Sequence, residues 1–361
     1  MAKSKGNPVN RRAPIALLFG GEGGEREISC LSAVGVAKAL DELSADYIGV
    51  YIDPKGYWYI LGRGVENIRR RDLRSAKPAY PARLVGNGCG FITDGEMIRV
   101  SSVIPVLHGD MGEDGVVQGA LRCAGIPYLG SDTYAGSLLM DKAYTKLLAE
   151  YSGIPTVPWF LYVHGERPST GGGKIATCRS EALAIAERLG YPLFVKPARS
   201  GSSIGAAGAS CPAELIRALK RAASVCTRVI VEKMLPSPVE LECAFLDMGK
   251  KIFLSPGSIV SRDGFYSYGS KYGGEGRVEI KAEAQVSDDV AEKIKKYSEA
   301  ICLLSGAADF ARIDFFLSED ELYFNEINTF PGMTEDSLFP RMTAHAGIPL
   351  KHMLTELLRR R

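Results

Sequence analysis

The sequence lacks the features that would direct the chain to nucleic acid, to a membrane or to zinc. Its 361 residues carry a net charge of only +2, so no excess of positive charge points to nucleic acid or an anionic membrane surface. Its eight cysteines include no Cys-x-x-Cys pair and no histidine at zinc spacing, which argues against a disulfide framework and a zinc site. The apolar run at residues 15–19 is too short for a secretory signal. We therefore expect a cytoplasmic protein with reduced thiols.

Two glycine-rich segments also lack familiar nucleotide-binding signatures. Residues 20–29 (GGEGGEREIS) do not form a dinucleotide-binding fingerprint, and residues 201–205 (GSSIG) are not followed by the Lys-Ser/Thr pair of a Walker A loop. The first segment carries Glu22, Glu25 and Glu27, which would repel a phosphate and suit an ammonium group. The second offers backbone amides and hydroxyls to an anion, and a strand delivers Lys196 just before it.

The length of the chain and its alternating strand and helix patterns predict an α/β protein of two or three domains. Residues 15–19 read as a strand, and the periodic run 31–43 reads as a helix that Ser29 should cap. This is the opening unit of a doubly wound domain, in which ligands collect at the strand ends. A second strand should end at His108, with the acids of GEDG (112–115) in the first turn of the next helix.

The segment 310–333 is the most informative stretch of the chain. Apolar runs at 310–317 and 322–327 flank a polar break at 318–321, which predicts a β-hairpin. Alternation then puts Arg312 and Asp314 on one face of the first strand, and Glu326 and Asn328 on one face of the second. For all four to share a side of the sheet, the loop must hold an odd number of residues. The register pairs Asp314 with Glu326, Ile313 with Ile327, and Phe316 with Phe324.

Two carboxylates that face each other across a sheet repel unless a cation lies between them. Asp314, Glu326 and the amide of Asn328 form an all-oxygen ligand set that suits Mg²⁺ or Mn²⁺, as one or two ions, with phosphate oxygens completing the shell. A solvated acidic hairpin is the alternative. The apolar neighbours of these carboxylates favour the metal site.

These residues resemble the metal-binding hairpin of the ATP-grasp ligases. Within that superfamily, the chain resembles the D-alanine-D-alanine ligases from about Ile15 to the C-terminus. The resemblance implies three domains: an N-terminal doubly wound (Rossmann-like) domain at 14–130 after a flexible tail at 1–13, a small α+β central domain at 131–236, and a C-terminal mixed-sheet domain at 237–361. It also implies ATP and D-alanine as substrates.

The same resemblance assigns roles to individual residues. Glu25 would hold the amino group of the first D-alanine, and His108 would lie beside it. Arg312 and the Gly332 amide would stabilise the oxyanion, and Ser337 and Lys271 would bind the second carboxylate beside a pocket shaped by Leu338. The remaining catalytic residues would be Ser202 and Tyr272. Nucleotide binding would fall to Lys142, Lys196, Ser203, Glu232, Lys233, Leu235, Glu240 and Phe265.

Several alternatives stay open at this point. Glu242 competes with Glu240 for the ribose, and the second substrate could be D-serine or D-lactate. A nucleotide sensor without turnover is a further alternative, although it would need neither Glu25, Arg312 nor the Lys271-Tyr272 pair. The segment 263–274 reads as a glycine-punctuated lid. The sequence leaves the oligomeric state open, with a homodimer as one option.

Overall fold

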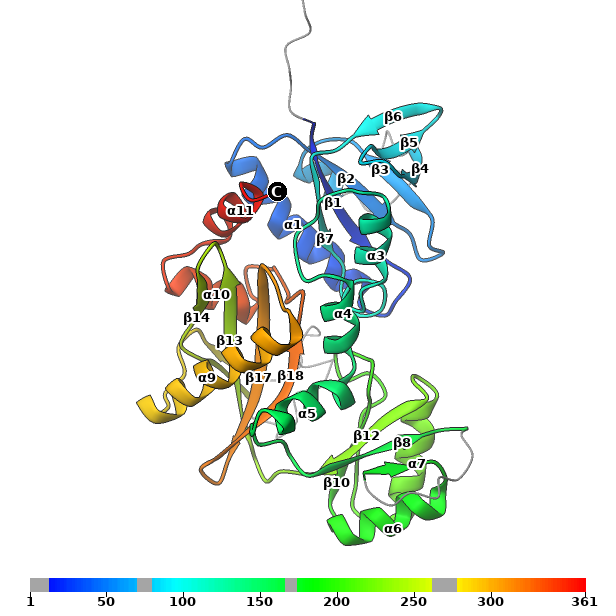
Figure 1. Cartoon of the computed structure of the whole chain (residues 1–361), viewed down its shortest axis with the longest axis vertical. Helices are drawn as coiled ribbons and strands as arrows, with labels where there is room; N and C mark the ends of the chain where they lie inside the picture. Colours follow the sequence, from blue (N-terminus) through cyan, green and yellow to red (C-terminus); the bar gives the residue numbers. More distant parts are fainter. Residues whose placement is uncertain (1–12, 70–79, 166–173, 262–277) are drawn as a thin grey trace, which may run out of the picture.

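The structure, a computed structural model, describes residues 13–69, 80–165, 174–261 and 278–361 (Figure 1). Three sheets follow one another along the chain, and helices connect and cover them. The α/β class predicted from the sequence is confirmed. The expected sites at Phe265, Lys271 and Tyr272, and the lid that would carry them, lie outside the described residues.

The first sheet has the strand order β6-β5-β4-β3-β2-β1-β7, and β1 runs parallel to both β2 and β7. Nearly every residue of β1 and β2 is buried, because helices cover this part of the sheet and leave no solvated face. The strands are β1 (Ile15–Gly20), β2 (Tyr47–Ile52), β3 (Trp58–Leu61), β4 (Tyr80–Val85), β5 (Gly90–Thr93), β6 (Glu96–Arg99) and β7 (Ser102–Val106). The helices are α1 (Arg26–Glu42), α2 (Val65–Arg69) and α3 (Val116–Cys123).

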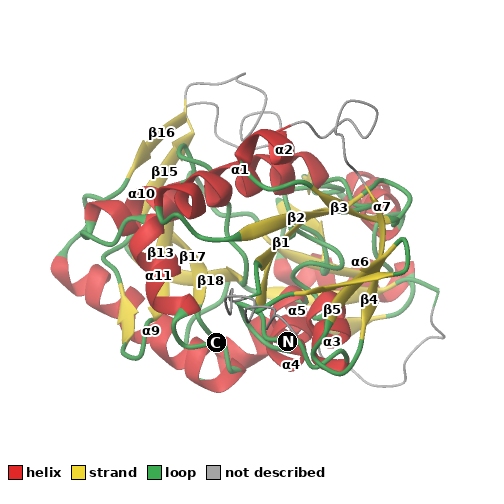
Figure 2. Ribbon diagram, turned by 90° about the horizontal axis from the view of Figure 1, so that it is seen from above, coloured by secondary structure: helices red, strands yellow, loops and turns green. Residues whose placement is uncertain are grey.

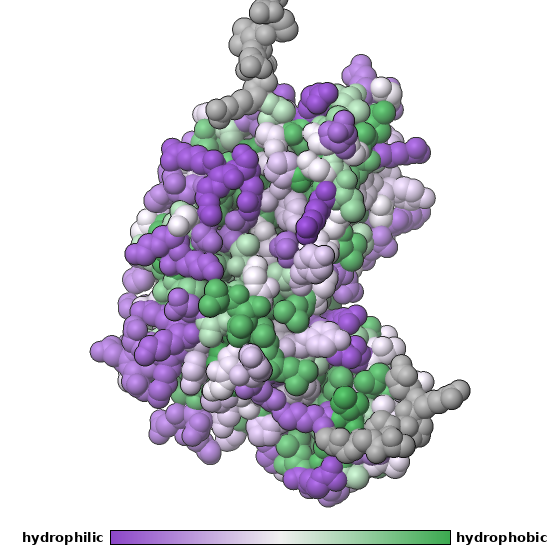
Figure 3. Space-filling view, in the orientation of Figure 1, coloured by the Kyte–Doolittle hydropathy of each residue, from purple (hydrophilic) through white to green (hydrophobic). Residues whose placement is uncertain are grey.

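The second sheet has the order β11-β10-β12-β8-β9 and forms the lower part of the molecule in Figure 1. Its apolar face packs on the buried sides of α6 and α7. In the space-filling view, the outline is hollowed between this part and the part above it (Figure 3). The elements are β8 (Trp159–Val163), β9 (Ile175–Ala176), β10 (Leu193–Pro197), β11 (Ala207–Ala209), β12 (Arg228–Lys233), α6 (Arg179–Leu189) and α7 (Pro212–Ala223).

The third sheet has the order β16-β15-β13-β17-β18, with β14 paired to β13. Its strands are β13 (Val239–Asp247), β14 (Lys251–Phe253), β15 (Gly257–Ser261), β16 (Val278–Lys281), β17 (Phe310–Ser318) and β18 (Glu321–Asn328). The helices around it are α4 (Thr133–Met140), α5 (Lys142–Tyr151), α9 (Asp288–Ser305), α10 (Leu338–His345) and α11 (Leu350–Leu358).

The cores of the chain cross the domain boundaries expected from the sequence. One continuous apolar core joins β1 and α1 to the third sheet and to α10 and α11. In Figure 2, α10 and α11 lie on one side of α1, and strands β1 and β2 lie on its other side. Helices α4 and α5 pack on the third sheet, although the sequence grouped them with the central domain. The boundaries at 130 and 236 therefore stay predictions.

Two local expectations were wrong. Helix α1 begins at Arg26 with Glu25 as its N-cap, so Ser29 lies inside the helix. The Ser29 hydroxyl accepts a hydrogen bond from the N–H of Gly20 (2.8 Å) and donates to the carbonyl of Val106. It ties the helix to the ends of β1 and β7 and does not cap it.

The second error concerns the segment around His108. Strand β7 ends at Val106, and α3 begins only at Val116, after Gly115 with a φ of 87°. The acids therefore precede the helix. Asp114 accepts hydrogen bonds from the N–H groups of Met111 and Val116, so its carboxylate folds the loop on itself and reaches the first residue of α3 from outside the helix.

All eight cysteines are free thiols. Within the part of the chain that the structure describes, we find no helix with the length and apolar character needed to span a bilayer.

Candidate active site

A cleft of about 740 Å³ lies between the second and third sheets. Strands β10, β12, β13, β17 and β18 and the loop after β10 form its walls. Many of the residues singled out in the sequence line it, although they come from distant parts of the chain. They are Lys142, Lys196, Ser202, Ser203, Glu232, Lys233, Leu235, Glu240, Asp314 and Glu326.

The hairpin of β17 and β18 pairs Asp314 directly with Glu326, and Arg312 with Asn328. The register predicted for this end of the hairpin, including Ile313 with Ile327, is confirmed. The rest of the predicted register was wrong, because Phe324 pairs with Phe315 and not with Phe316.

The cause is a β-bulge at Asn325. The loop contains only Glu319 and Asp320, both with positive φ, as a two-residue hairpin turn requires. An even loop would set the two strands out of phase, and the one extra residue in β18 restores the phase at Glu326. The bulge also turns Asn325 toward the cleft, where its Oδ1 accepts a hydrogen bond from Nζ of Lys196 (3.0 Å).

Basic side chains neutralise the paired carboxylates. Arg312 makes two hydrogen bonds to Asp314 (2.8 and 2.7 Å) and an ion pair with Glu242 (3.2 Å), and Lys142 makes an ion pair with Glu326 (2.9 Å). Burial works to lower the pKa of Arg312, but Asp314 and Glu242 outweigh it and raise that pKa. The guanidinium therefore stays charged in the site.

The donor set fits a hard divalent cation. Asp314 and Glu326 both line the cleft, and the Asn328 amide lies against Asp314, with Nδ2 3.0 Å from Oδ2. The described residues contain no group of three or more His, Cys, Asp or Glu side chains that could hold a metal, so here the third ligand would be an amide. Two carboxylates and an amide would thus leave coordination positions for phosphate oxygens, as Mg²⁺ sites usually do.

Lys196 and Glu232 face each other on neighbouring strands. Nζ of Lys196 lies 2.7 Å from Glu232, and Glu232 also pairs with Lys146 at 3.0 Å. Lys146 is completely buried on α5, and the sequence reasoning missed it. Its position, four residues after Lys142, puts it on the same helix face and could have indicated it.

The remaining nucleotide-site residues differ in how their side chains are used. Nζ of Lys142 donates to the carbonyl of Ser200 (2.8 Å), and Nζ of Lys233 donates to the carbonyls of Gly190 and Tyr191 (3.0 Å each). Glu240 and Glu242 both line the cleft, but Glu242 is buried against Arg312.

Glu25 connects the first sheet to the loop after β10. Ser202 donates a hydrogen bond to its carboxylate and so joins residues 20–29 to residues 201–205. Glycines make room for that carboxylate: a Cβ atom on Gly109 would overlap Oε2 of Glu25, and one on Gly201 would lie 2.7 Å from it. Two predicted catalytic residues, Glu25 and Ser202, are therefore in contact.

His108 lies beneath the loop that follows β18. Its Nε2 is 3.0 Å from the hydroxyl of Ser32, and its ring packs edge-on against Phe330. Burial, together with the charge of Arg312, lowers the pKa of His108 to about 4, while a hydrogen bond with the Phe330 backbone opposes the shift. His108 is therefore neutral at pH 7.

The sequence predicted Glu113 only as an acid in the first turn of a helix, yet its carboxylate joins two loops of the site. Its carboxylate accepts hydrogen bonds from the N–H groups of Gly109 (2.9 Å) and Phe330 (3.3 Å). Burial and the nearby Glu25 raise its pKa to about 8, against those hydrogen bonds and Arg312.

The residues expected to hold the second carboxylate lie at the start of α10. Ser337 is the N-cap of α10, and its hydroxyl is 2.7 Å from that of Thr334. Gly332 lies against Ser337, because a Cβ atom there would be 2.8 Å from Oγ. Leu338 is only 5% exposed and packs in the core against Gly257, so little of its side chain remains for a ligand.

Comparisons with known proteins identify the family. A family model described as "D-ala D-ala ligase N-terminus" matches residues 14–131, and one described as "D-ala D-ala ligase C-terminus" matches residues 148–359. The chain belongs to the D-alanine-D-alanine ligase family.

Relatives and solved structures match almost the whole chain. The D-alanine-D-alanine ligase of Ruminiclostridium cellulolyticum is 33% identical, with 95% of this chain and 94% of the relative covered. That of Mycolicibacterium smegmatis is 36% identical, with 96% and 95% covered.

Two crystal structures share the fold. The D-alanyl-alanine synthetase A of Vibrio cholerae has a TM-score of 0.82 and 29% identity, with 98% of this chain and 99% of that chain covered. The VanG D-Ala:D-Ser ligase of Enterococcus faecalis has a TM-score of 0.84 and 31% identity, with 97% and 99% covered. The three-domain ATP-grasp architecture implied by the sequence is confirmed.

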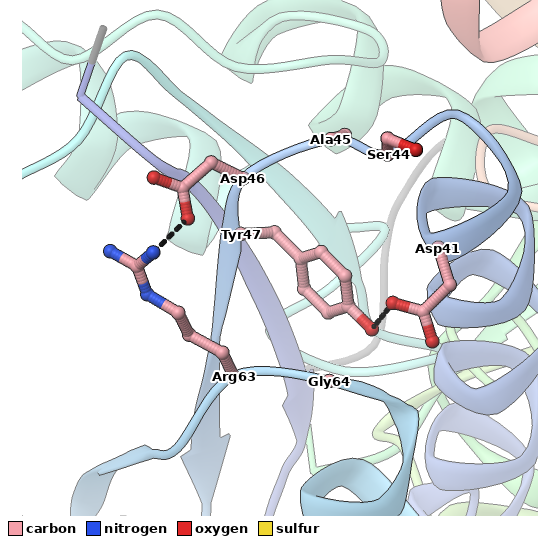
Figure 4. A pocket seen from close by; sticks show the side chains of 7 residues that line it. All are labelled: Asp41, Ser44, Ala45, Asp46, Tyr47, Arg63 and Gly64. Atoms are coloured by element: carbon pink, nitrogen blue, oxygen red, sulfur yellow. Dashed lines mark hydrogen bonds and ion pairs between the residues drawn. The ribbon is translucent and has the colours of Figure 1, made fainter. Parts of the chain in front are cut away.

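In this member of the ligase family, a separate cavity of about 630 Å³ lies on the N-terminal part, at the C-terminal end of α1 (Figure 4). Its polar side chains pair with one another. The Tyr47 hydroxyl donates to Asp41 (2.8 Å), and Arg63 pairs with Asp46 (2.7 Å). Ser44, Ala45 and Gly64 complete the lining and bring no further ionisable group. The larger cleft, in contrast, is lined by the carboxylates and lysines that the chemistry of the ligase family uses.

Proposed function

We propose that the chain joins two D-alanine molecules into D-alanyl-D-alanine with ATP, in the cytoplasm, for the synthesis of peptidoglycan precursors. One observation carries the proposal: Asp314 and Glu326 face each other in a cleft that also holds the ammonium groups of Lys142 and Lys196. Phosphoryl transfer from ATP uses carboxylates that hold a divalent cation and lysines that bind the phosphates, and this cleft offers two of each.

The nucleotide would lie in the cleft between β12 and β13. The backbone of residues 232–235 would hold the adenine and Glu240 the ribose, while Lys142, Lys196 and the amides at 201–205 would hold the phosphates. Lys233 would contribute its backbone, because its ammonium group already serves the carbonyls of Gly190 and Tyr191. A Mg²⁺ or Mn²⁺ ion on Asp314, Glu326 and Asn328 would draw charge from the phosphates as the γ-phosphoryl group moves.

The reaction has two steps. A carboxylate oxygen of the first D-alanine attacks the γ-phosphorus, ADP leaves, and an acyl phosphate remains. The amine of the second D-alanine then attacks the acyl carbon, phosphate leaves, and the amine releases its extra proton. Arg312 and the Gly332 amide would stabilise the oxyanion of this second step, and Glu25 would hold the first ammonium group.

D-Alanine is the second substrate that the site favours. Glu335 and Asp336 are the acids that could have drawn a water to a hydroxyl, but they pair with Lys38 (2.5 Å) and Arg341 (2.9 Å). A hydroxyl left unpaired in the pocket for the second side chain would cost about 1–3 kcal/mol, roughly a ten- to hundredfold preference for alanine.

Release of phosphate, measured with ATP and each D-amino acid in turn, tests the function. We expect release with D-alanine and none with L-alanine or without an amino acid. ATP binding without release under any of these conditions would favour a nucleotide sensor. D-Alanine and D-serine at equal concentration should give mostly D-alanyl-D-alanine, and a majority of the mixed dipeptide would overturn the assignment of the second substrate.

A further inference from the structure

Three charged side chains form a buried row behind the nucleotide cleft. Nζ of Lys146 lies 3.0 Å from Oε2 of Glu232, and Oε1 of Glu232 lies 2.7 Å from Nζ of Lys196. Lys196 reaches on to Oδ1 of Asn325 at 3.0 Å. The row therefore runs from Lys146 on α5 through Glu232 on β12 to Lys196, which lines the cleft.

The three residues differ in access to the cleft. Lys196 and Glu232 line it, on strands β10 and β12, while Lys146 does not and has no exposed surface. A nucleotide in the cleft can contact the first two residues but cannot reach Lys146. Any effect of Lys146 on the nucleotide must pass through Glu232 and Lys196.

A buried ammonium group is costly unless an anion compensates it. Burial lowers the pKa of Lys146 and Lys196 adds to the effect, while Glu232 opposes it. Burial works to raise the pKa of Glu232, but the two lysines outweigh it and hold that pKa below its usual range. Glu232 is therefore ionised and shared between two cations.

We propose that Lys146 is a positioning residue that balances the charge of Glu232, so that Lys196 keeps a net positive charge for the phosphates of ATP. Two lysines and one glutamate leave one positive charge in the row. Without Lys146, Glu232 and Lys196 form a neutral pair, and Glu232 draws the Lys196 ammonium away from the ligand. The inference rests on the proposal that the cleft binds ATP.

The test compares ATP with adenosine, which lacks phosphates. Dissociation constants of both are measured by competition against a fluorescent adenine nucleotide, for the parent and for Lys146→Met. One charge at roughly 10 Å in a medium of effective dielectric constant about 20 predicts on the order of tenfold weaker ATP binding. Adenosine binding should change little, so the ratio of the two constants reports on the phosphates alone.

The double variant Lys146→Met with Glu232→Gln separates charge from structure. It restores one positive charge to the row, so its ratio of ATP to adenosine affinity should return to within about threefold of the parent value. A purely structural role for Lys146 predicts that the double variant has a ratio of ATP to adenosine affinity at least as low as that of the single variant. Lys296→Met, on the exposed side of α9, is the matched lysine control and should leave both constants unchanged.

Two results would overturn the inference: an unchanged ratio in Lys146→Met, or a double variant whose ratio stays low. If Lys146→Met does not fold, the double variant alone decides, because charge balance predicts a ratio near the parent value for it and a structural role predicts a low ratio. A parent protein that binds ATP but forms no dipeptide would refute the ligase function and leave the charge balance standing.

Discussion

The hydroxyl of Ser32 lies 3.0 Å from Nε2 of His108, and this contact joins helix α1 to the segment after β7. The Ser32 oxygen also accepts a hydrogen bond from the N–H of Met333 (3.1 Å). The ring of His108 is neutral because of its burial, so Nε2 either accepts from the Ser32 hydroxyl or donates to its second lone pair. Helix α1 thereby holds both His108 and the backbone next to Gly332.

We expect Ser32→Ala to lower kcat/KM for D-alanine about tenfold. The change leaves the Met333 N–H and His108 Nε2 without their partner, which should cost about 1–3 kcal/mol and release the Gly332 loop. Steady-state kinetics and thermal unfolding measure the two effects. Ser152→Ala removes a helix hydroxyl that donates to Leu148, remote from this loop, and serves as the control. Equal kinetics in the two variants would show that Ser32 does not position the loop.

The glycine at position 109 should be required for the carboxylate of Glu25. Gly109 has a φ of 68°, so Gly109→Ala costs about 1 kcal/mol of backbone strain and also pushes against Glu25. Gly153 has a φ of 70° with open space around it. Gly153→Ala therefore carries the same backbone strain without a clash against a neighbouring side chain.

We expect similar thermal stability in these two alanine variants and a rise in KM for the first D-alanine of at least about tenfold in Gly109→Ala only. Initial-rate kinetics over a range of D-alanine concentrations make the comparison. Should both variants retain the parent KM, Glu25 does not hold the first substrate.

Removing one carboxylate of the hairpin should abolish most turnover without unfolding the chain. Glu326→Gln removes a charge opposite Asp314 and the ion pair with Lys142, and we expect kcat to fall roughly 10²- to 10³-fold, because transfer of the γ-phosphoryl group depends on electrostatic stabilisation. Glu321→Gln, at the exposed start of β18, is the control and should keep full activity. A folded Glu326→Gln protein with near-normal phosphate release would remove Glu326 from the site.

Stability should depend on pH through Glu113. Its pKa of about 8 in the folded protein lies above the value near 4.5 of the unfolded chain, so between these values the folded state holds a proton that the unfolded chain has lost. The contribution of Glu113 to the free energy of unfolding is thus present at low pH and is lost as the pH rises to 8, by at most about 1.4 kcal/mol per pH unit.

Glu113→Gln cannot titrate, so its melting temperature relative to the parent should rise steadily from pH 5 to pH 8. Melting curves at each pH unit give the difference, with Glu96→Gln on the exposed β6 as the control. A difference that stays constant across this range would mean that Glu113 is ionised in the folded protein.

The sequence alone determined those parts of the site that depend on neighbours in the chain. Alternation put Arg312 and Asp314 on one face of the first strand, and Glu326 and Asn328 on one face of the second, because the polar break between the strands already defined the hairpin. Strand and helix patterns around Lys142 and Lys196 likewise put both lysines at element ends, where ligands collect. These are local relationships, and the periodicity of the backbone is enough to fix them.

Tertiary structure decided the contacts that join distant segments. The bulge at Asn325 compensates a two-residue turn, and nothing in the alternation of β18 distinguishes a bulged strand from a regular one with a longer loop. Lys146, Ser32 and Glu113 look like ordinary polar residues of a helix or loop, since their partners lie on other elements. Their burial and protonation depend on the desolvation and charge that those partners supply, and only the folded chain brings these together.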